Sequence, residues 1–148
     1  MEHLALNGGV KIRKKPFPKH PIIGDEEKRQ VLEVLESGNI STFIASPGEN
    51  FLGGKKIREF ENKFAKKIGT TYGVAFNSAT SALHAAVVAV GVLPGEEVIV
   101  PPYTFTSTAT CALMHNAIPV YCDVKQDTYC YESAILERVT SKLSKAVI

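Results

Sequence analysis

The chain has 148 residues, of which 45% are hydrophobic and 22% are charged, a composition typical of a soluble globular protein with one ordinary core. Its 17 basic and 15 acidic residues are largely intermingled and give a net charge of +2, which argues against nucleic acid or an acidic membrane surface as the partner. No apolar run reaches membrane-spanning length, and the three cysteines lack metal-type or disulfide spacing. We therefore expect a cytoplasmic protein with reduced thiols and no metal site.

The N-terminal third predicts an arm, a helix and a long loop. Residues 1–24 contain three prolines and little periodicity, so we expect an extended arm that packs on another body. A helix is predicted from Asp25, as its cap, to about Ser37, with Gly38 available to end it. The stretch 39–54 is polar and contains four glycine or proline breaks, which predicts a loop of the kind that borders pockets.

A second helix follows this loop. Its apolar residues step by three or four positions, with lysines on the other faces. These apolar residues are Ile57, Phe60, Phe64 and Ile68. Gly69 is expected to close the helix, and the lysines are interpreted as a solvated face.

The stretch from 72 to 91 changes its hydrophobic period in the middle. We predict a buried strand at 72–76, a turn at 77–81 and a helix that continues to about residue 90. Small and hydroxylated residues leave the first N–H groups of this helix uncovered, so these groups and the helix dipole favour a bound phosphate. The alternative is that Ser78 only caps the helix. The turn lacks the glycine pattern of nucleotide-binding loops, which argues against an unrelated nucleotide-binding domain.

The remaining sequence alternates strands and helices. Strands are predicted at 97–100, 118–122 and 145–148, and helices at 106–115 and 132–141. This alternation predicts an α/β fold with a mainly parallel sheet and right-handed crossovers. Phe105 follows the carboxyl end of a strand, where open α/β sheets bind ligands, so it is a candidate for stacking on a flat cofactor. An ordinary core position is the alternative for Phe105, and Asp123 is interpreted as a turn or capping residue.

The sequence resembles the DegT/DnrJ/EryC1/StrS family of sugar aminotransferases from about residue 4 to the last residue. Three segments carry the resemblance in order: Gly53-Gly54 with Phe60-Glu61 and Phe64-Ala65, then FNSATSALHAAVVAVGVLPGEEVIVPPYTFTSTA, then IPVYCDV with Asp127-Thr128-Tyr129. Each segment alone is a weak signal, whereas the ordered set is specific.

The resemblance implies an enzyme that depends on pyridoxal 5′-phosphate (PLP) and has the aspartate aminotransferase fold. The expected architecture is the three-layer, mainly parallel sheet of a fold type I large domain. The implied reaction moves an amino group from glutamate or glutamine to a keto-sugar or keto-cyclitol. Ala79, Thr80 and Ser81 match the residues that hold the cofactor phosphate, and Phe105 matches the aromatic residue that stacks on the pyridine ring. A homo-oligomer is also implied, because the family builds its active site at a dimer interface.

The resemblance also implies that part of the site lies elsewhere. In the family, the lysine that binds the cofactor covalently and the carboxylate facing the pyridine nitrogen are C-terminal to the segments matched here. We therefore expect residues 25–148 to be the N-terminal part of an incomplete PLP-binding domain that is inactive alone, and we assign no catalytic residue. Lys145 is interpreted as a surface lysine and His84 as structural. Two alternatives stay open: a PLP-dependent sugar dehydratase of the same family, and a truncated paralogue that serves as a binding or dimerisation module.

Overall fold

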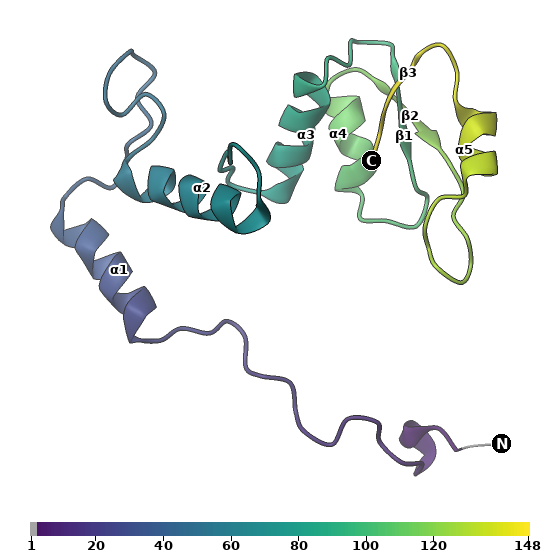
Figure 1. Ribbon diagram of the computed structural model, residues 1–148, viewed down its shortest axis with the longest axis horizontal. Helices are drawn as coiled ribbons and strands as arrows, with labels where there is room; N and C mark the ends of the chain where they lie inside the picture. The colour runs from purple at the N-terminus through teal and green to yellow at the C-terminus, as the bar shows by residue number, and fades with distance from the viewer. Residues whose placement is uncertain (1–2) are drawn as a thin grey trace. The chain divides into compact units, whose positions relative to one another are not determined.

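The computed structural model describes residues 3–148, which divide into one unit ending at Gly54 and a second unit spanning Lys55–Ile148 (Figure 1). The first unit contains a short 3-10 helix, η1 (Ala5–Asn7), and one α-helix, α1 (Asp25–Glu36). Between them, residues 9–24 form no helix or strand.

Helix α1 begins at Asp25, one residue earlier than a cap at Asp25 would place it, so the assignment of Asp25 as the cap is wrong. Gly24 is the extended residue before the helix, and its N–H donates to the Glu27 carboxylate at 2.7 Å. The side chain of Glu27 therefore reaches back over the first turn and replaces the expected aspartate cap. At the other end, Gly38 has a φ of +67°, which confirms it as the stop.

The loop 39–54 closes on itself at its two adjacent glycines. The Gly54 N–H donates to Thr42 Oγ1 at 2.9 Å, and a Cβ on Gly54 would lie 2.6 Å from that oxygen. Gly53 has a φ of +84° and lies under the ring of Phe43. Both glycines are buried, so the loop tolerates no side chain at its point of closure.

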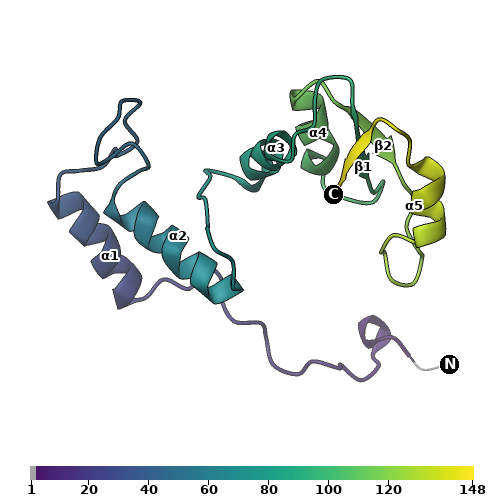
Figure 2. The same cartoon turned by 45° about the horizontal axis from the view of Figure 1, so that its top comes forward.

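The second unit has the predicted α/β order. Its elements are α2 (Lys55–Ile68), α3 (Ala79–Ala89), β1 (Glu97–Val100), α4 (Ser107–Met114), β2 (Ile118–Tyr121), α5 (Ser133–Val139) and β3 (Ser144–Val147). The three strands are parallel in the order β2-β1-β3. Helices α3 and α4 lie on one side of the strands and α5 on the other (Figure 2), which confirms the predicted three-layer, parallel α/β class.

The core of this unit is built on β1. Val98 and Val100 are fully buried in a cluster that includes Val87 of α3 and Cys111 of α4. Ile99 is also buried but lies outside this cluster, because alternate residues of a strand point to opposite faces of the sheet. Small residues such as Ala109 and Ala112 bring α4 close to the strand. The central strand is thus covered on both faces.

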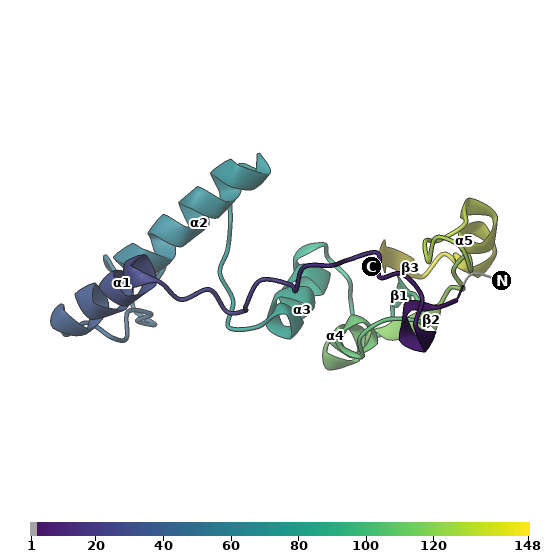
Figure 3. The same ribbon diagram turned by 90° about the horizontal axis from the view of Figure 1, so that it is seen from below.

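The strand predicted at 72–76 is wrong. The segment runs from α2 to α3 without joining the sheet (Figure 3), and the side chains of Tyr72 and Val74 are 83% and 72% exposed. A strand needs a neighbouring edge, whereas the Ala75 N–H donates to the Glu61 carboxylate of α2 at 2.8 Å. Gly73 lies so close to α2 that a Cβ would be 2.8 Å from the Glu61 carbonyl oxygen. The segment therefore packs along a helix instead.

The start of β3 is fixed by a carboxylate on the neighbouring strand. Glu97 accepts hydrogen bonds from Ser141 Oγ at 2.6 Å and from Ser144 Oγ at 2.8 Å. These two bonds lower the pKa of Glu97 below its ordinary value. Near the end of β3, the Tyr131 hydroxyl donates to the Ile148 carbonyl oxygen at 2.8 Å, and burial raises the pKa of Tyr131 to about 12. Side chains thus supplement the backbone pairing along β3.

We expect acid to destabilise the wild-type chain more steeply than the Glu97→Gln variant. The folded-state pKa of Glu97 is lowered, so its contribution to stability is present above the unfolded pKa of about 4.3 and is lost as the pH falls through the folded pKa. Urea unfolding midpoints measured from pH 6 to pH 3 provide the test. Glu137→Gln, on an exposed position of α5, is the matched control and should follow the wild type. Parallel curves for wild type and Glu97→Gln would contradict this account.

Candidate functional site

The turn before α3 combines a helix cap with uncovered donors. Ser78 is extended, and its Oγ accepts a hydrogen bond from the Ser81 N–H at 3.1 Å. The Ser78 carbonyl oxygen accepts from the Ala82 N–H, which is the first hydrogen bond of the helical ladder. Within residues 3–148, no group accepts from the N–H of Ala79 or of Thr80. Capping by Ser78 therefore occurs and still leaves two backbone donors.

These donors make the start of α3 suitable for an anion. The first turn contains no acidic residue that would repel one. Ala79 is exposed, and the Thr80 hydroxyl has no partner among the described residues, so both the backbone and a side chain can donate. Each favourable contact with the helix dipole contributes about 0.3–1 kcal/mol when exposed. Such a set of donors fits a cofactor phosphate.

Phe105 lies at the same end of the unit as this turn. The chain passes from β1 through α4 to the parallel strand β2, so α4 must begin at the carboxyl end of β1. In Figure 1, α3 also begins at that end. Phe105 is 76% exposed, so it is not a core residue, and its carbonyl oxygen accepts a hydrogen bond from the Thr108 N–H at 3.0 Å. The backbone of Phe105 is therefore held by a hydrogen bond, while its side chain is exposed to solvent.

Lys145 and Asp123 have local structural roles. Lys145 lies on β3, half exposed, with its Nζ 3.5 Å from Glu96 Oε1. Asp123 Oδ1 accepts from the Val124 N–H at 2.8 Å, which makes it a turn residue after β2. Both observations agree with the interpretations drawn from the sequence.

His84 lies within the helix layer. Its ring centroid is 6.2 Å from that of His115, which follows α4. Nε2 of His115 is 2.7 Å from the Val92 carbonyl oxygen. The contact between the two rings links the middle of α3 to the C-terminal end of α4, which agrees with a structural role for His84.

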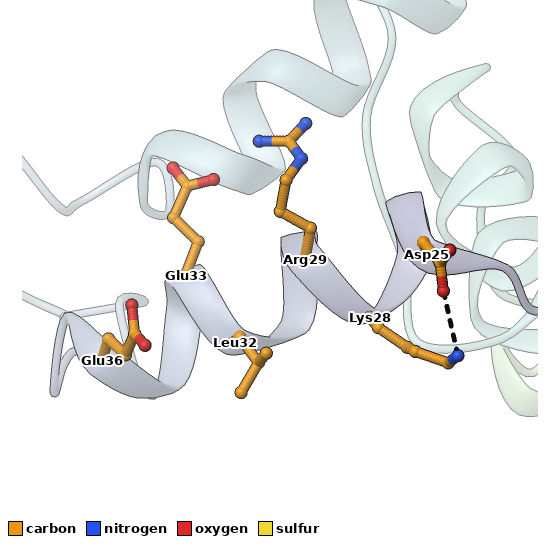
Figure 4. Close-up of a pocket in the computed structure, with 6 residues that line it drawn as sticks. All are labelled: Asp25, Lys28, Arg29, Leu32, Glu33 and Glu36. Carbon is orange, nitrogen blue, oxygen red and sulfur yellow. Dashed lines mark hydrogen bonds and ion pairs between the residues drawn. The ribbon is translucent and has the colours of Figure 1, made fainter.

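Among the described residues, two hollows offer space for a ligand, and one of them borders the turn before α3 through Ser78 and Ala79. One, of about 470 Å³, lies between α2 and the start of α3 and is lined mainly by apolar groups, among them Phe60 and Phe64. Its one carboxylate, Glu61, already accepts from the Ala75 N–H. The other hollow, of about 490 Å³, is lined by six residues of α1 alone (Figure 4), so it is one face of a single helix. Its Asp25–Lys28 ion pair, at 3.1 Å, is exposed.

The contact between two exposed tyrosines, Tyr103 and Tyr129, was not predicted from the sequence. The ring centroids of Tyr103 and Tyr129 are 5.5 Å apart. The signal was present, because each tyrosine follows the carboxyl end of a predicted strand. Their separation of 26 positions in the chain hid the pairing until the strand order was known.

Several kinds of group are absent from the part of the chain that the structure describes. No lysine there is buried. No helix among these residues combines the length and the apolar composition needed to cross a membrane. They contain no cluster of three or more histidine, cysteine or acidic side chains placed to hold a metal ion.

Comparison with known proteins gives a consistent set of relatives. Spore coat polysaccharide biosynthesis protein SpsC of Bacillus subtilis (strain 168) is 39% identical over 128 residues, which are 86% of this chain and 30% of SpsC. L-glutamine:scyllo-inosose aminotransferase of Streptomyces griseus is 32% identical over 144 residues, 97% of this chain and 33% of that enzyme. The chain therefore spans about a third of the length of these relatives.

Solved structures of similar proteins share the fold. The structure of 3-amino-5-hydroxybenzoic acid synthase matches with a TM-score of 0.78 and 30% identity, covering 89% of this chain and 32% of that one. NtdA of Bacillus subtilis, solved with bound cofactor PMP, matches with a TM-score of 0.71 and 27% identity, covering 93% of this chain and 30% of that one. The model of the DegT/DnrJ/EryC1/StrS aminotransferase family matches residues 21–148. With its parallel three-layer fold and these relatives, the chain belongs to the DegT/DnrJ/EryC1/StrS aminotransferase family.

Proposed function

We propose that this chain supplies the phosphate-binding and ring-stacking part of a PLP-dependent aminotransferase. The reaction would move an amino group from glutamine or glutamate to a keto-sugar or keto-cyclitol. The observation that carries the proposal is the pair of backbone donors on Ala79 and Thr80 that no described residue uses. The similarity to a scyllo-inosose aminotransferase supports this class of substrate.

The residues of the turn and of the loop after β1 would divide the work of holding the cofactor. The N–H groups of Ala79 and Thr80, with the hydroxyls of Thr80 and Ser81, would bind its phosphate. The exposed ring of Phe105 would cover one face of the pyridine ring and exclude water from it. PLP, when bound, supplies the electron sink for amino transfer. No residue of this chain is assigned to proton transfer.

We further propose that residues 25–148 form the N-terminal part of the PLP-binding domain, that 1–24 are an arm, and that the chain alone does not transaminate. Covalent capture of the cofactor requires a desolvated, positioned lysine. Every lysine among residues 3–148 is at least partly exposed, and Lys145 is paired with Glu96. Cys111 and Cys122 are buried free thiols, which fits a reducing, cytoplasmic setting.

A homo-oligomer is part of the same proposal. Large apolar side chains remain exposed on every helix of the second unit up to α4 and on β2. Examples are Phe64, Val88, Leu113 and Tyr121. Burying such surface is the main source of free energy for association.

The Ala79→Pro variant should bind inorganic phosphate about 2- to 5-fold more weakly than the wild type, because it removes one donor of the site. Proline suits this first helical position, and Ser78 before it is extended, so α3 should remain intact. The measurement is a phosphate titration followed by backbone amide shifts. In the wild type we expect the shifts to centre on residues 78–82.

Ser133→Pro is the matched control, since it makes the same change at the first position of α5, after an extended Glu132. It should leave phosphate affinity unchanged, whereas Thr80→Asp should abolish binding by placing a like charge at the site. Equal phosphate affinity in Ala79→Pro and wild type, or shifts centred elsewhere, would contradict phosphate binding at this turn. The turn would then be only the capped start of α3.

Phe105→Ala should weaken binding of 4-deoxypyridoxine 5′-phosphate by about 2- to 13-fold, as expected for the loss of one aromatic stacking contact. This analogue lacks the aldehyde and so reports on the ring and phosphate contacts without labelling lysines. Folding stability should change by less than about 0.5 kcal/mol, because the ring is exposed. Phe17→Ala, which removes another exposed ring, is the control, and equal affinities in the two variants would refute the stacking role.

Sedimentation of the chain at micromolar concentration should show species heavier than the 16.1 kDa monomer. The reason is that association would bury the exposed apolar side chains described above, and removing apolar surface from water is favourable. Raising the protein concentration should increase the fraction of heavier species. A single monomeric boundary across this range would contradict the proposed self-association.

A further inference from the structure

Two tyrosines meet at the carboxyl edge of the sheet, outside the residues assigned to the cofactor. Tyr103 follows β1, and Tyr129 lies in the loop after β2. Because β1 and β2 are adjacent and parallel, their carboxyl ends lie at the same edge of the sheet. The loops that follow β1 and β2 lie side by side at this edge (Figure 1). The ring centroids are 5.5 Å apart with an interplanar angle of 34°. The side chains are nevertheless 78% and 64% exposed, so the pair offers its outer faces to solvent.

The loop that carries Tyr129 is internally braced. Val124 and Tyr131 form an antiparallel bridge, and the Lys125 N–H donates to the Cys130 carbonyl oxygen at 3.0 Å. The Tyr129 N–H donates back to the Lys125 carbonyl oxygen at 2.9 Å. These bonds hold Tyr129 at a φ of +55°, a left-handed conformation that a bulky side chain rarely adopts. Costly backbone conformations of this kind concentrate at ligand-binding positions.

The polar ends of the two tyrosines are also available. Within residues 3–148, neither hydroxyl has a hydrogen-bond partner, although each can donate and accept. An aromatic face beside a free hydroxyl matches a ring that has C–H groups on its faces and hydroxyl groups around its rim. Sugars and cyclitols have this chemistry, whereas a purely apolar ligand would leave the hydroxyls unused.

We propose that Tyr103 and Tyr129, here named the tyrosine platform, bind the polyhydroxylated six-membered ring of the keto-sugar or keto-cyclitol and so contribute to substrate specificity. The platform adjoins the cofactor position, because Tyr103 is two residues from Phe105. The identity of the ring as the substrate rests on the proposed function. The inferred contact itself rests on the geometry of the two tyrosines.

The test is binding of scyllo-inosose to the 148-residue chain, followed by NMR of the backbone amides and tyrosine rings. We expect shifts centred on residues 103 and 129, and a 2- to 13-fold lower affinity in Tyr103→Ala and in Tyr129→Ala, about the loss of one aromatic contact. Tyr103→Phe should keep most of the affinity, since the ring remains. The acyclic polyol sorbitol should bind more weakly than scyllo-inosose.

Tyr72→Ala is the matched control, because Tyr72 is 83% exposed and lies in the same unit, in the segment between α2 and α3. Equal affinity in Tyr72→Ala and both platform variants would overturn the proposal, as would equal binding of sorbitol. A loss of self-association in the platform variants with unchanged scyllo-inosose affinity would instead make the pair a subunit contact. Phosphate added to the same samples reports on residues 78–82 separately, so failure of the platform and failure of the cofactor site give different spectra.

Discussion

The parallel pairing of β1 with both of its neighbours is the constraint on which the candidate site depends. Parallel strands require crossover connections, so the helices that follow them begin at the carboxyl edge. This single requirement brings Phe105, Tyr103 and Tyr129 to one edge, although they come from two different loops. Complete burial of Val98 and Val100 fixes β1 between its helices and thereby fixes the edge.

Prediction from sequence succeeded where the signal was local. Helical spacing, glycine stops and short apolar runs placed α1 to α5 and β1 to β3, with ends that differ by one or two residues. It failed at 72–76, because an apolar run predicts a buried strand, whereas Tyr72 and Val74 are exposed and the segment pairs with no strand. Here the Glu61 carboxylate takes the Ala75 N–H. The start of α1 is a second example. The sequence offered Asp25 as the capping residue, whereas Gly24 is the cap and its N–H donates to the Glu27 carboxylate.

The candidate site was only partly predictable for a related reason. The uncovered N–H groups of Ala79 and Thr80 follow from the sequence, since every helix leaves its first donors without partners. The exposure of Phe105 does not follow, because aromatic residues after a strand occur both in cores and at open edges. The pairing of Tyr103 with Tyr129 required the strand order, which no local pattern contains.

The two kinds of recognition proposed for this edge tolerate sequence change differently. Backbone donors at a helix start persist through most substitutions, so the phosphate position can stay constant while other residues vary. Side chains on the loops after β1 and β2 can change without disturbing the buried strand beneath them. The anion position is therefore tied to the fold, and the ring-binding position is tied to individual residues. A family that keeps one cofactor while acting on different rings would require this separation.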